Sequence, residues 1–159
     1  MRRRDREITD RDEIIRIMSN CEVIHIAFHG QEYPYVIPFN FGMRNDNSEL
    51  IIYLHGAKTG TKYDLLAKNN KVGFAMECRT KLITSTNACE YTMEYESVCG
   101  NGEIVLVTST EEKLKALTRL MKQYDKGAPL NFTSEMVEQV GVMKLIVNEI
   151  SGKRLKTGK

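Results

Sequence analysis

Strand-like segments dominate the sequence, and short turns join most of them. The expected strands cover residues 22–28, 33–42, 50–54, 71–77, 90–107 and 142–150. Several of them alternate apolar and polar side chains, which is the period of a sheet with one face in a core. A parallel sheet would need a crossover connection, usually a helix, between its strands, and the sequence has no such regular alternation. The pattern therefore predicts a mainly β fold with peripheral helices, most simply an antiparallel barrel.

Four helices are expected around these strands. They are placed at about residues 10–20, at 61–68, from Ser109 onward and at 134–140. Asp10 can cap the first helix, with Glu13 three residues later, and Ser109 with Glu112 forms a capping box for the longest one. The helices should pack on the periphery of the barrel.

The length of 159 residues fits one domain, which we expect to span residues 1–159. The net charge is +2 and rests on 23 basic and 21 acidic residues, so nothing in it requires nucleic acid or a membrane surface as a partner. The basic start is followed at once by acidic residues instead of an apolar run, which argues against a secretory signal. No stretch reaches the length of a membrane span. We expect a cytoplasmic protein whose basic segment 153–159 is a solvated end.

Cysteine and histidine spacing gives no sign of a metal site. The four cysteines form no C-x-x-C pair, which favours free thiols in a reducing compartment. His25 and His29 fall on the same side of an expected strand, but no third ligand lies near them in sequence. We expect two surface histidines and no bound metal.

Two expected strands have features that could serve a ligand or a partner. Pro34 and Pro38 interrupt the strand at 33–42, and proline removes a ladder donor, so this strand should lie at an edge or carry a bulge. Its free backbone groups could then receive a flat ligand. The strand at 90–107 is polar on both faces, and its Gly100-Asn101-Gly102 fits either a hairpin turn or a bulge in one long strand.

The loop from His55 to Lys62 is a candidate anion site. It supplies glycines, hydroxyl groups and two lysines where a helix should begin, and a helix N-terminus offers free N–H groups and a positive dipole end. Only three residues separate Gly56 from Gly60, and Thr61 follows, so the P-loop pattern fails and a nucleotide triphosphatase is disfavoured. Taken alone, the loop is better explained as a tight turn with solvated lysines than as an anion site.

Four segments, taken together, resemble the 5-nitroimidazole resistance proteins of the pyridoxamine 5'-phosphate oxidase-like split-barrel superfamily. They are RRDREI at 3–8, YPYVIPFNFG at 33–42, YLHGA at 53–57 with Gly60 and Lys62, and MEYESV at 93–98. The resemblance covers nearly the whole chain. It implies a six-stranded antiparallel split β-barrel that forms a homodimer, with flavin mononucleotide (FMN) held at two sites between the subunits. The dinucleotide form, FAD, stays open as the alternative cofactor.

The resemblance also implies roles for individual residues. Thr61 and Lys62 would bind the flavin phosphate, at the end of a loop that contains Gly60. The residues that would line the flavin, or offer backbone groups to its ring, are Val36, Ile37, Pro38, Phe39, Asn40, His55, Gly56 and Ala57. Ser97 would approach the cofactor from the partner subunit. His55 matches a histidine that resembles a reactive position in the nitroimidazole branch, and a histidine that only packs and hydrogen-bonds is an equal alternative.

One departure bears on the activity. The oxidase branch places an arginine directly before the lysine of this loop, where this chain has Thr61, and among its substrate-binding basic residues only Arg154 has a counterpart here. Vitamin B6 oxidation is therefore disfavoured. The resemblance favours a flavin-dependent reductase of nitroaromatic or related small substrates, with electrons from a reduced nicotinamide or a protein donor. The alternatives are a flavin-binding carrier, sensor or electron-transfer protein without turnover, and a barrel that has lost its flavin.

Overall fold

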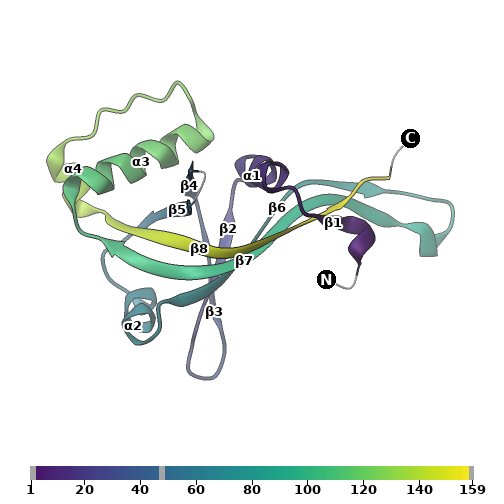
Figure 1. Cartoon of the computed structure of the whole chain (residues 1–159), viewed down its shortest axis with the longest axis horizontal. Coiled ribbons are helices and arrows are strands. Elements are labelled where there is room, and N and C mark those ends of the chain that lie inside the picture. The colour runs from purple at the N-terminus through teal and green to yellow at the C-terminus, as the bar shows by residue number, and fades with distance from the viewer. Residues whose placement is uncertain (1–2, 47–48, 158–159) are drawn as a thin grey trace.

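A computed structural model describes residues 3–46 and 49–157, which form a mainly β structure with helices at its periphery (Figure 1). The strands are β1 (Glu7–Ile8), β2 (Ile24–Phe28), β3 (Tyr35–Phe39), β4 (Phe41–Asp46), β5 (Glu49–Gly56), β6 (Lys71–Ile83), β7 (Thr92–Val107) and β8 (Gly141–Leu155). The helices are α1 (Arg11–Ser19), α2 (Thr61–Lys68), α3 (Thr110–Tyr124) and α4 (Ser134–Gln139), with 3-10 turns at Arg4–Arg6 and Ala88–Glu90.

All strands belong to one antiparallel sheet with the order β3-β2-β6-β7-β8-β5-β4, and β1 pairs with β8. The sheet is not closed, because β3 and β4 are its end strands. The predicted fold class is confirmed, but the described strands number eight where six were expected. One extra strand arises because the segment 33–42 divides at Asn40 into β3 and β4, and the other is the two-residue β1.

The predicted helix starts are confirmed. The Asp10 side chain accepts hydrogen bonds from the backbone N–H groups of Asp12 (2.9 Å) and Glu13 (3.1 Å), and the Ser109 hydroxyl accepts one from the N–H of Glu112. These bonds satisfy donors that the first helical turn leaves free. Helix α2 has the predicted bounds, and α4 ends one residue earlier than expected.

The Gly100-Asn101-Gly102 segment lies within one long strand and is not a hairpin turn, and the residue that the bulge leaves without a partner is Asn148 of β8. Strand β7 continues through it, and its register with β8 shifts between Asn101 and Gly102. A Cβ atom on Gly100 would lie 2.4 Å from the carbonyl oxygen of Glu149, and one on Gly102 would lie 2.1 Å from that of Ile146. Only glycine fits where β8 comes this close.

The expectation of a solvated basic end at 153–159 was wrong for its first residues. Strand β8 runs to Leu155, and Arg154 pairs in register with Glu96 of β7. Residues 158–159 lie outside the described part of the chain. The reason for the difference is a buried carboxylate: the Glu96 side chain is only 1% exposed and needs cationic partners, which Arg154 helps to provide.

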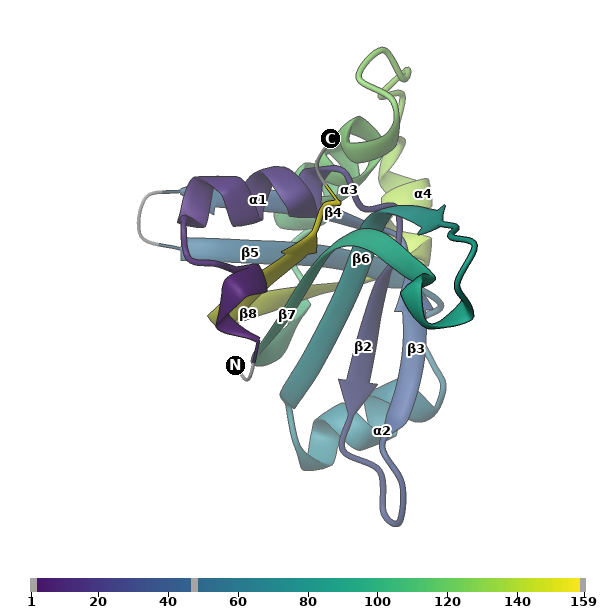
Figure 2. The same ribbon diagram turned by 90° about the vertical axis from the view of Figure 1, so that its right-hand side faces the viewer.

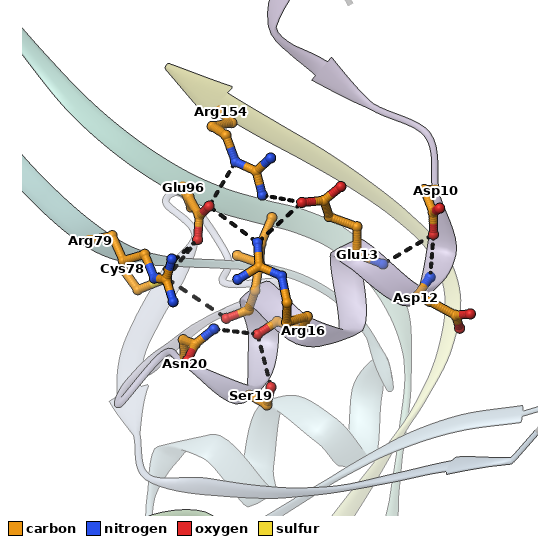
Figure 3. A network of polar contacts seen from close by, with 11 residues as sticks. Asp10, Asp12, Glu13, Arg16, Ser19, Asn20, Cys78, Arg79, Glu96 and Arg154 are labelled. Carbon is orange, nitrogen blue, oxygen red and sulfur yellow. Dashed lines mark hydrogen bonds and ion pairs between the residues drawn. The ribbon is translucent and has the colours of Figure 1, made fainter. Parts of the chain in front are cut away.

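Figure 3 shows the polar network built around Glu96. Its carboxylate contacts the guanidinium groups of Arg154 (2.7 Å), Arg16 (3.3 Å) and Arg79 (3.5 Å). Burial alone would raise the pKa of Glu96, but the guanidinium groups of Arg154 and Arg16 outweigh it and hold the pKa below its usual value. Glu13 also pairs with Arg154 and Arg16. The network fastens α1 to the strands β6, β7 and β8.

The main core lies between α1, α2 and the inner face of the sheet. Its side chains include Ile17, Met18, Ile24, Ile26, Phe28, Phe41, Ile52, Leu65, Met76, Met143 and Leu145. A second cluster forms where α3 and α4 cover the other face of β5, with Ile51, Tyr53, Ala116, Leu117 and Val137 among its members. Strand β5 is therefore covered on both faces, which makes it a rigid support for the loop that follows it.

Candidate functional site

The sheet splits at Asn40, where the chain changes strand partners. Up to Phe39 it pairs with β2, and from Phe41 it pairs with β5, with Phe41 opposite Leu54. Strand β3 is thus an end strand, as its prolines predicted, and none of the described strands pairs with its outer edge. Figure 2 shows β3 and β5 running in different directions from this point. We call the place where β3 and β5 diverge the split; as an end strand, β3 has backbone donors and acceptors on its outer edge that no described strand uses.

A tyrosine from α3 holds the change of partner in place. The Tyr124 hydroxyl accepts a hydrogen bond from the Phe41 N–H (2.9 Å) and donates one to the Glu22 carbonyl oxygen (2.8 Å). The Asn40 side-chain amide donates to the same carbonyl at 3.3 Å. We call Asn40 and Phe41 with these bonds the β3–β4 junction. Sequence reasoning missed this role of Tyr124, because the sequence shows only an aromatic residue near the end of an amphipathic helix.

On the other side of the split, the loop 57–60 leads from β5 into α2. Gly60 is the N-cap residue of α2 and has a φ of +120°, a conformation that favours glycine. It has no side chain that could cap the helix, and the Tyr63 N–H bonds to the Gly60 carbonyl oxygen (2.9 Å), so in the described structure the N–H groups of Thr61 and Lys62 have no side-chain cap. These donors and the positive end of the helix dipole can bind an anion.

Tyr63 and Gly141 fix the shape of this loop, and sequence reasoning missed both. The Tyr63 hydroxyl donates a hydrogen bond to the Ala57 carbonyl oxygen at 2.8 Å. Gly141 pairs with Gly56, and a Cβ atom on Gly141 would lie 2.2 Å from the Tyr63 hydroxyl oxygen. A side chain at position 141 would displace the tyrosine. The only signal in the sequence is a glycine after a short helix, which is typical of an ordinary helix end.

Lys62 presents its ammonium group beside the loop. Its Nζ lies 4.6 Å from the centre of the Tyr63 ring and 3.4 Å from the Thr59 carbonyl oxygen. Within residues 3–46 and 49–157, no carboxylate forms an ion pair with it. A Cβ atom on Gly56 would lie 3.8 Å from Lys62 Nζ, so glycine leaves the space before the ammonium group open. The charge is available to an anion.

His55 is half-buried next to the β3–β4 junction. Burial lowers its pKa, so the imidazole is neutral at pH 7. Its Nδ1 atom is buried and finds no hydrogen-bond partner in the described part of the chain. Leaving a buried polar atom unpaired costs about 1–3 kcal/mol. A ligand that hydrogen-bonds to Nδ1 would remove this cost.

The structure brings two of the expected site residues, Asn40 and His55, to the same end of one strand pair. They flank the pair Phe41–Leu54, which is the last pair of β4 and β5 on that side. The other expected residues continue along the chain from these two: Val36, Ile37, Pro38 and Phe39 on β3, and Gly56, Ala57, Gly60, Thr61 and Lys62 along the loop and the start of α2. Val36 is 54% exposed, and Pro38 is also exposed.

Ser97 is not part of this group within one chain. On β7 it lies ten positions before Val107, whose β8 partner Val142 pairs with His55. Ten residues of strand span about 33 Å. Ser97 instead lies in register with Glu77 and Lys153, on the part of the sheet away from α2.

The arrangement suits a flat ligand that carries a phosphate. Lys62 and the start of α2 supply cationic and N–H groups, the edge of β3 supplies backbone hydrogen bonds, and His55 supplies one unpaired polar atom. Among the described residues, no group of three His, Cys, Asp or Glu side chains could hold a metal ion. No helix in the same part of the chain is both long and apolar enough to cross a membrane.

Comparisons with known proteins agree with this fold. A model of the pyridoxamine 5'-phosphate oxidase family matches residues 10–154. The chain is similar to a candidate 5-nitroimidazole antibiotic resistance protein from Bacteroides thetaiotaomicron, at 31% identity and a TM-score of 0.80, over 93% of this chain and 86% of that one. No curated protein matches the sequence.

Two more distant structures show the same fold. A flavocytochrome from Azotobacter vinelandii has 19% identity and a TM-score of 0.79, over 99% of this chain and 72% of that one. An FAD and heme binding protein from Mycobacterium smegmatis has 16% identity and a TM-score of 0.81, over 96% of this chain and 74% of that one. At these identities the likeness concerns the fold alone.

Proposed function

The chain belongs to the pyridoxamine 5'-phosphate oxidase family, and from this membership we propose that it binds a flavin, FMN in the first instance, in the split between β3 and β5. We further propose that it is a reductase of nitroaromatic or related small substrates. The observation that carries the proposal is the change of strand partner at Asn40, which ends the pairing of β3 with β2 and begins that of β4 with β5 one residue from the pair beside His55.

The residues present fit the parts of a flavin mononucleotide. Thr61 and Lys62 would hold the phosphate, because they combine helix N–H groups with a cation that has no carboxylate partner among the described residues. The backbone of residues 36–40 would hydrogen-bond the polar edge of the ring, and His55 Nδ1 would gain the partner it lacks. Gly56 and Gly60 would let the ligand approach the backbone closely.

The bound flavin would supply the redox chemistry, and the protein would bind, orient and shield. His55 is neutral at pH 7, so it is better suited to a hydrogen bond with cofactor or substrate than to a role as a permanent cation. Lys62 would anchor the phosphate and take no part in proton transfer. The exposed side of β3, with Val36 and Pro38, would leave room for a substrate over the ring.

We also propose that the chain works as a homodimer in which the partner subunit contributes Ser97 to the site. Two observations support this. Ser97 lies too far along β7 to reach the split of its own chain. The sheet face around it has small side chains in register, with Ala75 opposite Cys99 and Cys99 opposite Ser151, so another sheet could approach closely. Light scattering that gives the mass of a monomer at micromolar concentration would contradict the dimer.

Two measurements test the function. The first is the visible spectrum of the purified protein after incubation with excess FMN and gel filtration, which should show retained flavin. In the second, the flavin bound to the protein is reduced chemically without oxygen, a nitroimidazole is added, and its consumption is measured. A protein that retains no flavin refutes the whole proposal, whereas one that retains flavin but leaves the nitro compound unchanged refutes only the reductase.

A further inference from the structure

A groove lies between α3 and β4, away from the start of α2. It is a groove of about 590 Å³ lined by Met43 of β4 and by residues of α3 that recur once per turn. Its size falls in the range of small-molecule sites. Helices α2 and α3 lie on opposite sides of the sheet in both views (Figures 1 and 2). Gly42 permits the close packing, because a Cβ atom there would lie 2.4 Å from the backbone nitrogen of Leu120.

Three cations converge on this groove, which we call the α3 groove. They are Lys115, Arg119 and Lys122. Lys115 pairs with Glu111 at 2.6 Å, but both side chains are well exposed. An exposed ion pair is weak, so the charge of Lys115 can still act on a ligand. Over residues 3–46 and 49–157, neither Arg119 nor Lys122 forms an ion pair. The groove therefore has a surplus of positive charge.

This surplus contrasts with the neighbouring strand. Arg44 on β4 forms ion pairs with both Asp46 and Glu49. Arg119 offers a planar guanidinium that can bind phosphate through two parallel hydrogen bonds, and Lys122 adds a point charge one turn away. The Thr118 hydroxyl lies on the same wall. The polar half of the groove thus matches a diphosphate.

The remaining wall is apolar. Leu114 is 40% exposed and lies with Met43 along the groove, which gives a surface on which a nucleoside base can lie. A groove with only cations would favour any polyanion, whereas the combination of diphosphate and apolar subsites favours a nucleotide. The two subsites together fit a nucleoside diphosphate.

The groove is connected to the β3–β4 junction through the end of α3. Gln123 lines the groove, and its side-chain amide donates hydrogen bonds to the carbonyl oxygens of Ser19 and Cys21. The next residue, Tyr124, holds the β3–β4 junction. Consecutive residues of α3 therefore serve the groove and the junction, on the opposite side of the sheet from α2 and Lys62 (Figures 1 and 2).

From this geometry we propose that the α3 groove binds the diphosphate of a reduced nicotinamide dinucleotide. The position on the opposite side of the sheet from Lys62 favours a second nucleotide over the adenosine half of FAD. The link to a flavin rests on the proposed function, whereas the binding of the nucleoside diphosphate does not. The sequence left the electron donor open, and this groove supplies a place for one.

The test measures the binding of ADP to the full chain without flavin, by calorimetry at low salt. The variant Arg119→Ala/Lys122→Ala removes two charges from the groove. The matched control Lys81→Ala/Lys156→Ala also removes two charges, one from β6 and one from the residue that follows β8. We expect saturable ADP binding that weakens at least tenfold in the first variant and less than twofold in the control. No saturable binding, or equal loss in both variants, overturns the proposal.

Two further arms identify the source of the diphosphate. If it belongs to a reduced nicotinamide dinucleotide, the Kd of NADH or NADPH rises in Arg119→Ala/Lys122→Ala while the ratio of FAD to FMN affinity stays unchanged. If that ratio falls instead and NADH binding is unaffected, the groove holds the adenosine half of FAD, which overturns the assignment to a nicotinamide. A protein that binds ADP in the groove but no flavin refutes the proposed function alone.

Discussion

Replacing Lys62 with alanine should weaken the binding of FMN without unfolding the protein. The ammonium group makes a long contact to the Thr59 carbonyl oxygen (3.4 Å) and lies over the Tyr63 ring, interactions worth about 0.5–1 kcal/mol to stability. Its charge near the positive end of α2 opposes part of this by about 0.3–1 kcal/mol. The free energy of unfolding should therefore change by less than about 1 kcal/mol.

The loss in affinity should be much larger. A hydrogen bond between a charged amine and a phosphate contributes about 1.5–3 kcal/mol, so the Kd for FMN should rise about 10- to 150-fold in Lys62→Ala. Riboflavin has no phosphate, and its Kd should change less than about twofold. Fluorescence titration of both flavins measures the difference, and thermal melts check the fold.

The matched control is Lys68→Ala, at the other end of the same helix. Lys68 is exposed and lies near the negative end of α2, far from the loop 57–60. This variant should bind FMN as the wild type does. The reasoning is refuted if Lys62→Ala weakens FMN and riboflavin equally, or if FMN binds to it with unchanged affinity.

Three other substitutions test the supports of the site and of the fold. Glu96→Gln should lower the free energy of unfolding by about 2–4 kcal/mol at pH 7. The folded state lowers the pKa of Glu96, so the stabilisation that its carboxylate provides is complete above the ordinary pKa of 4.5 and is lost as the pH falls through the lowered value. Chemical denaturation should therefore show that the stability difference between wild type and Glu96→Gln becomes smaller in acid. Gly141→Ala should displace Tyr63, cost about 1–3 kcal/mol and weaken FMN binding in a titration. Tyr124→Phe should leave the Phe41 N–H without its partner, cost about 1–2 kcal/mol in a urea melt and also weaken FMN.

Each of these three has a control on the chain. Glu103→Gln changes a carboxylate on the same strand that makes no ion pair in the described structure, and it should leave the pH dependence of stability intact. Gly127→Ala adds a methyl group at an exposed turn, where the nearest atom is 3.5 Å away. Tyr91→Phe removes the hydroxyl of a half-exposed tyrosine. Equal effects in a control and its partner variant would contradict the assigned contacts.

Local signals in the sequence were enough for the helices and for the edge character of β3. Asp10 and Ser109 cap helices because a short oxygen-bearing side chain reaches N–H groups two or three residues later, an interaction contained in a few residues. Pro38 indicates an end strand for a similarly local reason, because proline itself lacks the N–H group that a central strand would use. The start of α2 at Thr61 also follows from its local sequence.

Contacts between distant residues account for what the sequence did not predict. The strand at 33–42 had to be divided at Asn40, and the bond that fixes the division comes from Tyr124, 83 residues after Phe41. The end of β8 was expected to be solvated because Arg154 lies in a basic run, yet its partner Glu96 lies 58 residues away. Gly141 has no recognisable role until the Tyr63 hydroxyl is placed beside it.

The β3–β4 junction explains why these distant contacts matter for function. If β3 and β4 were one uninterrupted strand paired with a single partner strand, no split would form. The junction forms because Tyr124 satisfies the Phe41 N–H and Asn40 shares the Glu22 carbonyl oxygen. One helix end thus opens the proposed flavin site, and the turn before it lines the α3 groove. A ligand that shifts the end of α3 would therefore act on the Phe41 N–H and on the Glu22 carbonyl oxygen that Asn40 shares, which gives the two sites a physical means of influencing each other.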